Sequence, residues 1–478
     1  MNGERSIECD LCVIGAGSAG LSVTAGAAQL GVKTVLVERG EMGGDCLNVG
    51  CVPSKALIAA GRRAHDMRHT AQFGISPVEP EIDFAATLGH VSGVIETIAP
   101  VDSQERFEGL GATVIREHGE FIDGQTLQAG SWRIRARRFI IATGSRPAVP
   151  PIPGLEDVPY LTNETLWADR GKPEHLIIIG GGPIGVEMAQ AHRRLGSKVT
   201  IIEMARLLAR DDEDLANVVR DRLVAEGVNA QEGAAVKAVK KSRDGSIAVE
   251  VETDGRREDV VGDQLLVATG RQVITDGLGL EKAGVAFDRR GITVDRGLRT
   301  SNRRIYAIGD ASGDMQFTHV AGYHAALIIR NALFRLPIKK DQAAIPRVTY
   351  SEPELATVGL IEAEAREQYG DSVTVLKSEF AHNDRAIAER ETEGLIKVIV
   401  GGRGKILGAG IVGRQAGELI NPWVLAMSQN IKIAAMASMV APYPTLAEIN
   451  KRAAGTFFAP KLFSDRTRSI VRLLTKLG

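Results

Sequence analysis

The chain has 478 residues, of which 44% are hydrophobic and 24% charged, so we expect two to four globular domains and exclude a disordered or fibrous protein. A formal net charge of −1 and only 4% aromatic residues argue against nucleic acid as a partner. The polar start MNGERSIECD has no signal-peptide pattern and no run approaches about 20 apolar residues, so a cytoplasmic protein without a membrane partner is expected.

The first predicted unit is CDLCVIGAGSAGLSVTAGAAQLGVKTVLVERG, which reads as strand, glycine turn, helix and strand. Gly15, Gly17 and Gly20 have the G-x-G-x-x-G spacing that lets a pyrophosphate approach a helix N-terminus. Glu38 ends the second strand, where an acid can bind a ribose hydroxyl. Together these features predict a dinucleotide-binding βαβ unit; the alternative is a glycine-rich turn that only packs a helix on a sheet.

Two cysteines follow in the stretch GGDCLNVGCVPSK. Residues five apart in a continuous helix have Cα atoms more than about 8 Å apart, whereas a disulfide needs less than about 7 Å. A bond between Cys46 and Cys51 therefore requires a break in the helix, which Asn48 and Gly50 permit. Pro53 suits the first turn of the next helix, where a thiol ionises more easily. A redox-cycling pair is favoured over a permanent disulfide and over a metal site, for which no further ligand lies at zinc spacing.

The glycine pattern recurs in HLIIIGGGPIGVEMAQAHRRLGSKVTIIEM. Here Gly180, Gly182 and Gly185 precede a second predicted helix, and the strand after it ends in Glu203. Two fingerprints predict two dinucleotides and two binding domains, joined by a proline-rich linker at 146–154.

Three further strands have informative ends. FIIATGSRP carries Thr143 and Gly144, LLVATGRQ carries Gly270, and IYAIGDASG carries Asp310 at a position where ligands bind in open α/β sheets. From about residue 345 the fingerprints stop. Strand-like runs then alternate with helices, including one expected over 412–430, which indicates an α+β domain of different character.

These motifs together resemble the FAD-dependent pyridine nucleotide-disulfide oxidoreductases, a family that includes dihydrolipoyl dehydrogenase, glutathione reductase and mercuric reductase. The resemblance covers essentially the whole chain. It implies an α/β fold with two Rossmann-like domains, for FAD and NAD(P), and a C-terminal α+β domain that forms a homodimer with a shared active site. The expected FAD domain is 1–150 with 275–344, the NAD(P) domain is 151–274, and the dimerisation domain is 345–478.

The resemblance also implies roles for individual residues. Cys46 would meet the substrate, Cys51 would contact the flavin, and Lys55 would lie near the flavin N5, paired with Glu187. A helix-surface charge is the alternative for Glu187. The residues expected at FAD are Gly15, Gly17, Gly20, Glu38, Gly44, Thr143, Gly144, Asp310 and His319, and those at NAD(P) are Gly180, Gly182, Gly185, Glu203 and Gly270.

The expected electron path runs from NADH to FAD, then to Cys46–Cys51, and from the dithiol to an acceptor. Glu203 can bind a free 2′-hydroxyl and would repel a 2′-phosphate, which favours NADH. Arg206 and Arg210 follow Glu203 closely in the sequence, so NADPH stays possible as the reductant.

The chain departs from the disulfide-reducing members in the stretch VAPYPTLAE. Those members supply a His–Glu pair from H-x-H-P-T-x-x-E of the partner subunit, whereas here Tyr443 stands in the histidine position and Glu448 is retained. A phenol is a poor base at pH 7. Mercuric reductases resemble this chain in having a tyrosine at that position. They can dispense with an acid–base histidine because a soft metal ion is held by the thiolates themselves. They also end in a vicinal cysteine pair, which RSIVRLLTKLG lacks.

Four functions therefore stay open on sequence. The first is reduction of a small-molecule or protein disulfide of unassigned identity, and the second is dihydrolipoyl dehydrogenase activity. The third is reduction of a mercuric or other soft metal ion. The fourth is a flavoprotein that acts as a redox sensor or scaffold. No resident metal site is expected.

Several lesser features have more than one interpretation. His319 could hydrogen-bond the flavin, carry protons, or be an ordinary satisfied polar residue. The stretch FAHNDRAIAE is expected to be an exposed turn, with substrate entry as the alternative. The amphipathic basic segment 465–478 is expected to pack on the dimer, with a membrane surface as the alternative. Cys9 and Cys12 are expected to be buried core residues.

Overall fold

The computed structural model describes residues 5–168 and 171–477. Its largest sheet has seven strands in the order β3-β2-β1-β6-β5-β4, with β19 paired to β6. The strands β1, β2, β3, β6 and β19 are parallel, and β4 and β5 form an antiparallel extension. Their bounds are β1 Arg5–Ile14, β2 Thr34–Val37, β3 Thr113–Ile115, β4 Gly119–Asp123, β5 Thr126–Ala129, β6 Trp132–Ile141 and β19 Ile305–Ala307. A strand after residue 300 thus completes the sheet begun at residue 5.

Helices cover this sheet and extend from it. Helix α1 (Ser18–Gln29) packs against α8 (Thr318–Ile328), so the first and the late segment share one core. Helix α3 (Cys51–Arg68) leads away from the redox motif and packs on α4 (Phe84–Ile98) and on the neighbouring domain. Cys9 and Cys12 are buried in β1, as the sequence predicted.

The second sheet is fully parallel and has the order β11-β10-β9-β15-β8. Helices α6 (Pro183–Arg194) and α7 (Glu213–Ala225) flank it, and an antiparallel sheet β12-β13-β14 lies beside it. The strand bounds are β8 Tyr160–Leu161, β9 His175–Ile179, β10 Lys198–Glu203, β11 Asn229–Glu232, β12 Ala235–Lys241, β13 Ile247–Thr253, β14 Arg256–Gly262 and β15 Gln264–Val267. The two connections to the first sheet pair with each other as β7 (Ser145–Pro147) and β16 (Arg271–Val273).

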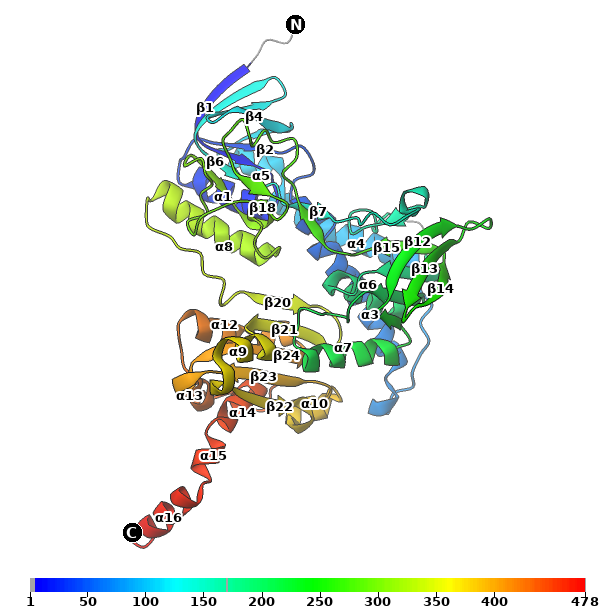
Figure 1. Cartoon of the computed structure of the whole chain (residues 1–478), viewed down its shortest axis with the longest axis vertical. Coiled ribbons are helices and arrows are strands. Elements are labelled where there is room, and N and C mark those ends of the chain that lie inside the picture. The colour runs from blue at the N-terminus through cyan, green and yellow to red at the C-terminus, as the bar shows by residue number, and fades with distance from the viewer. Residues whose placement is uncertain (1–4, 169–170, 478) are drawn as a thin grey trace.

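The C-terminal domain is an antiparallel sheet in the order β20-β21-β24-β23-β22, covered by helices (Figure 1). Its core includes the fully buried Trp423, whose Nε1 donates to Asn450 Oδ1 at 2.8 Å. The bounds are β20 Pro346–Thr349, β21 Glu354–Gly359, α9 Glu362–Tyr369, β22 Thr374–Glu379, α10 Asp384–Glu389, β23 Leu395–Val400, β24 Ile406–Gly413, α11 Ala416–Leu419, α12 Asn421–Ser428, α13 Ile433–Ser438 and α14 Glu448–Thr456.

The prediction of a single helix over 412–430 is wrong. Residues 406–413 form the fully buried central strand β24, and two short helices follow it, the second with a proline in its first turn. Because proline lacks the N–H that a continuing helix needs, the chain restarts there.

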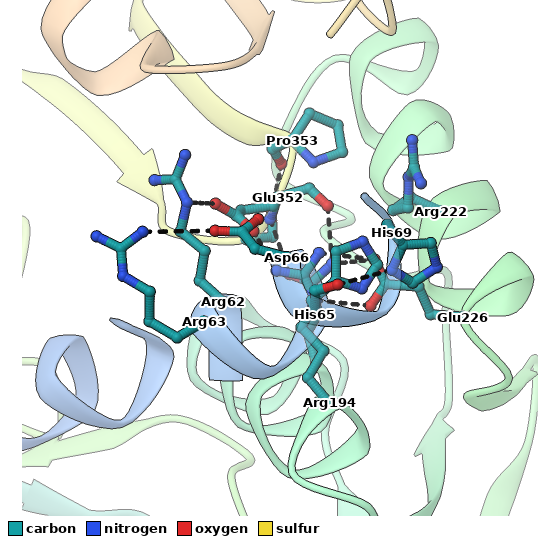
Figure 2. Close-up of polar contacts among 12 residues, drawn as sticks. Arg62, Arg63, His65, Asp66, His69, Arg194, Arg222, Glu226, Glu352 and Pro353 are labelled. Atoms are coloured by element: carbon teal, nitrogen blue, oxygen red, sulfur yellow. Dashed lines mark hydrogen bonds and ion pairs between the residues drawn. The ribbon is translucent and has the colours of Figure 1, made fainter. Parts of the chain in front are cut away.

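The three domains meet at a cluster of charged side chains (Figure 2). Arg194 of α6 is buried and pairs with Glu226 at 2.7 Å and with Glu352, which also takes Arg62 of α3 at 2.9 Å. His65 of α3 and His69, the residue after the helix, stack beside them, with ring centroids 3.9 Å apart. Since this cluster joins residues from all three domains, it fixes α3 against α6 and the C-terminal sheet.

One stretch, Phe84–Gly109, reaches the length and apolar composition of a membrane-spanning helix, so the expectation that no stretch would do so is wrong. This finding rests on the length and the apolar composition of the stretch alone. The stretch consists of α4, a 3-10 turn containing Pro100, and α5 (Gln104–Gly109), and α4 packs on α3.

Candidate redox site

The two cysteines lie on either side of a break between helices. Cys46 is in α2 (Gly44–Asn48), and Cys51 is the first residue of α3. Asn48 Nδ2 donates to the carbonyls of Met42 and Gly44 at 2.9 Å and so closes the short helix. The predicted interruption is therefore confirmed, and both cysteines are free thiols.

The surroundings make the two thiols unequal. The pKa of Cys51 is lowered from 9.0 to about 6, chiefly because the Cys46 thiol hydrogen-bonds to its sulfur. The Thr318 hydroxyl, 3.3 Å from that sulfur, and the Lys55 charge act in the same direction against burial. The pKa of Cys46 is raised, first by the same hydrogen bond and then by burial. The site thus holds a thiolate at Cys51 and a proton at Cys46 near neutral pH.

The expected Lys55–Glu187 pair is present. Lys55 Nζ lies 2.9 Å from Glu187 Oε2, and the Glu187 side chain is buried, so the interpretation as a helix-surface charge is wrong. The other oxygen of Glu187 accepts from the Tyr350 backbone N–H at 2.9 Å. Lys55 Nζ also stands 4.3 Å from the centre of the Tyr350 ring. The ammonium is held in place by a carboxylate and an aromatic face from two other domains.

The first glycine fingerprint forms a cradle at the N-terminus of α1. Gly15 has φ +106°, and a β-carbon there would lie 2.4 Å from the Ala142 carbonyl oxygen. Gly17 caps α1 without a side-chain hydrogen bond. A β-carbon on Gly44 would lie 2.7 Å from the Cα of Gly17. The exposed N–H groups and the close backbone approach suit a pyrophosphate. These residues therefore fit the dinucleotide that the sequence predicts.

A cavity opens beside this cradle at the carboxyl ends of the parallel strands. Glu38 follows β2 there and accepts from the backbone N–H groups of Ala16 at 2.5 Å and Gly40 at 2.6 Å. The cavity is lined by Ile14, Gly15, Val37, Glu38, Arg39, Glu117, His118, Gly119, Thr143, Ile274 and Leu278. Glu38 thus lies where a ribose would bind.

The later residues expected at FAD follow β6 and β19 or lie in the first turn of α8. Asp310, in the 3-10 turn Gly309–Ser312 that follows β19, accepts from Ser145 Oγ at 2.5 Å, and burial raises its pKa. Thr143 Oγ1 donates to the Ile274 carbonyl at 3.0 Å, and Gly144 has φ +71°. His319 is exposed and donates from Nε2 to the Pro346 carbonyl at 2.9 Å. This contact agrees with the interpretation as a satisfied polar residue.

The second fingerprint repeats the first in geometry. A β-carbon on Gly180 would lie 2.5 Å from the Ala268 oxygen, and one on Gly185 would lie 2.0 Å from the Gly180 oxygen. Gly182 caps α6 without a side-chain bond and faces open space, as does Gly270 at φ +127°. A second nucleotide therefore fits at the N-terminus of α6.

Glu203 and Arg206 behind this fingerprint are both engaged in local hydrogen bonds, whereas Arg210 is exposed. Glu203 accepts from the N–H groups of Gly181 at 2.7 Å and Ala205 at 2.8 Å. Arg206 turns toward backbone carbonyls, including that of Asp211 at 2.6 Å. Its guanidinium is thus engaged within its own loop.

Tyr443 lies in an exposed loop of the C-terminal domain, with 71% of the residue accessible. Its hydroxyl donates to Asp384 Oδ2 at 2.9 Å, and this hydrogen bond raises the pKa of Tyr443. Glu448 begins α14 and lies 3.5 Å from the Thr445 N–H. The tyrosine therefore pairs with an aspartate from α10, in the stretch FAHNDRAIAE, and not with Glu448.

Sequence reasoning missed two contributors to the site. Tyr350 carries no motif, and only the fold brings its backbone to Glu187. Asp384 belongs to the stretch FAHNDRAIAE, for which sequence predicted an exposed turn or a role in substrate entry but no contact with Tyr443. Within residues 5–168 and 171–477, no three or more His, Cys, Asp or Glu side chains converge as a metal site.

Comparison with known proteins identifies the family of both parts of the chain. Residues 9–325 match the family described as pyridine nucleotide-disulphide oxidoreductase, and residues 345–454 match its dimerisation domain. A mercuric reductase of Streptomyces lividans is 36% identical over 94% of this chain and 96% of its own length. A dihydrolipoyl dehydrogenase of Geobacillus stearothermophilus is 35% identical over 95% and 97%. Overall identity therefore does not separate the two activities.

A solved structure supports the same fold. The Cu(II) complex of the HOCl-induced flavoprotein disulfide reductase RclA from Escherichia coli superposes with a TM-score of 0.82 at 28% identity. The match covers 93% of this chain and 99% of that one.

Proposed function

The chain belongs to the flavin-dependent pyridine nucleotide-disulfide oxidoreductases, and we propose that it is a homodimeric NADH-dependent reductase of a soft metal ion. Membership of the family establishes an FAD-dependent NAD(P)H oxidoreductase. The preference for NADH rests on Glu203, whose carboxylate would repel a 2′-phosphate, and on the engagement of Arg206 within its loop. Bound FAD supplies the two-electron relay between the nicotinamide and the cysteine pair.

The cysteine pair supports this assignment through its asymmetry. Cys51 is poised as a thiolate and Cys46 holds the proton that stabilises it. Lys55 adds positive charge beside Cys51 and is itself fixed by Glu187. Reduction of the pair gives two sulfur ligands of the kind that soft metal ions prefer.

The hydrogen bond from Tyr443 to Asp384 is the observation that carries the choice of acceptor. In the homodimer we place Tyr443 of one subunit opposite the cysteines of the other, where the histidine of disulfide-reducing relatives acts. A phenol that donates to a carboxylate has a raised pKa and cannot accept a proton near pH 7. Thiol–disulfide exchange needs such an acceptor, whereas metal reduction by a dithiolate does not.

Mercuric reductases among the relatives and the Cu(II) complex of RclA support this choice by similarity. Dihydrolipoyl dehydrogenase is the second candidate, because relatives of that activity are as similar in sequence. For Hg(II), the two electrons of one NADH account for reduction to the elemental metal.

The test is a panel of acceptors assayed by NADH oxidation with the FAD-loaded dimer. We expect turnover with Hg(II) in excess thiol for the wild type, and little with lipoamide or glutathione disulfide. Tyr443→His should raise lipoamide turnover, while Tyr443→Phe should leave metal turnover unchanged. Fast wild-type lipoamide turnover with none on Hg(II) or Cu(II) would establish the second candidate instead.

A further inference from the structure

The C-terminal segment leaves the body of the molecule as an extended arm (Figure 1). Helix α15 (Ala459–Leu462) follows the C-terminal domain, and α16 (Asp465–Leu474) follows α15. The match to the family's dimerisation domain ends at residue 454, before both helices. No residue of α16 is buried, and its first turn is capped by its own Ser464, which accepts from the Thr467 N–H at 3.3 Å. The helix therefore presents all its faces outward.

The arm has one predominantly apolar face. At about 100° per residue, the apolar side chains of α16 and the turn after it fall within one arc of roughly 160°. These side chains, with their exposed fractions, are Ile470 48%, Val471 50%, Leu473 62%, Leu474 58% and Leu477 76%. Leu462 and Phe463, just before α16, are also more than half exposed. Nothing in the described chain covers this apolar face.

The opposite face of the arm is cationic. At about 100° per residue Arg468, Arg472 and Lys476 fall on this face, whereas Arg466, one turn before Ile470, falls within the apolar arc. Lys461 lies in α15. Asp465 is the only acidic residue of the segment 461–477, whereas the whole chain has a net charge of −1. Positive charge is thus concentrated on the arm.

An apolar face beside a cationic one favours a lipid surface over a second copy of the arm as the partner. Two arms that packed their apolar faces together would enclose the two Arg466 guanidiniums, while Asp465, the arm's only carboxylate, lies on the opposite face. An anionic lipid surface accepts leucines at the acyl boundary while phosphates and carboxylates surround the arginines and lysines. Short length is no obstacle, because such a helix lies in the interface and does not cross it.

We propose that residues 461–477 dock the enzyme on the surface of an anionic lipid bilayer. The apolar arc enters the headgroup boundary, where the long Arg466 side chain can reach a lipid phosphate, and the cations of the opposite face add attraction to the anionic surface. The catalytic domains stay outside the bilayer, since the arm carries them away from it. This inference is independent of the acceptor that the enzyme reduces.

Flotation of the full-length FAD-loaded dimer with vesicles tests the proposal. We expect the wild type to float with phosphatidylcholine–phosphatidylserine vesicles, to float less with phosphatidylcholine alone, and to be released by high salt. The double change Leu473→Gln and Leu474→Gln should lower the partition coefficient by about tenfold or more, because two apolar anchors are lost. Leu336→Gln, at a leucine exposed outside the arm, is the matched control and should float normally.

Two results would overturn the proposal. One is a wild type that does not bind anionic vesicles at low salt. The other is a double variant that binds them normally yet sediments as a monomer or unfolds at a lower temperature, since the arm then packs on a second copy, as the sequence favoured. NADH-dependent activity in solution should be equal in the wild type and the variant.

Discussion

Replacing Cys46 by alanine isolates the interaction that creates the reactive thiolate. The Cys46 thiol is the largest cause of the lowered pKa of Cys51, which falls from 9.0 to about 6. Without this donor, burial raises the pKa of Cys51 while Thr318 and Lys55 still lower it. Because these effects oppose each other, we expect the pKa of Cys51 to return toward 9. At pH 7 the thiolate fraction would then fall from about 90% to about 1%, a loss of almost two orders of magnitude.

Alkylation of the reduced FAD-loaded enzyme measures this change directly. The rate of iodoacetamide labelling at Cys51, followed by peptide mass spectrometry, should rise with an inflection near pH 6 in the wild type and near pH 9 in Cys46→Ala. Thr318→Val removes a smaller contribution and should give an intermediate inflection. An unchanged inflection near pH 6 in Cys46→Ala would refute the assignment of the hydrogen bond as the dominant cause.

Two pairs of substitutions, one of glycines and one of histidines, probe the scaffold around the site. Gly185→Ala places a β-carbon 2.0 Å from the Gly180 oxygen and should cost about 1–3 kcal/mol of stability in thermal unfolding, whereas Gly182→Ala meets open space and should fold normally but bind NADH weakly. Equal melting temperatures for both would contradict this. Burial lowers the pKa of His65 from 6.5 to about 4, so the unfolded chain takes up the proton first and stability should fall by about 1–3 kcal/mol as the pH drops through this range. His65→Gln should reduce that loss, and His90→Gln, exposed on α4, should not; the same acid sensitivity in both variants would count against the effect of burial.

The parts of the fold that sequence predicted are those set by local steric demands. Gly15 and Gly180 are required because a β-carbon would strike a carbonyl of a neighbouring strand end, and this demand is visible as a spacing of glycines. The contact of Tyr350 with Glu187 joins residues 163 positions apart, and that of Tyr443 with Asp384 joins residues 59 apart. Neither pair has a period or motif, so only the assembled domains reveal them.

The loop that carries the cysteines is also held by the two segments that connect the nucleotide domains. Asp45, next to the first cysteine, accepts from Asn163 at 3.1 Å and pairs with Arg271 at 3.0 Å, and the Trp167 indole donates into the break between the two helices at 3.0 Å. Negative charge on Asp45 raises the pKa of Cys51, so the arginine opposes that effect by neutralising it. Because these partners come from the strands and turns that enter and leave the second domain, a shift of that domain alters both the geometry and the charge beside the thiolate. The readiness of the cysteine pair to react is therefore tied to the position of the domain that binds the reducing nucleotide.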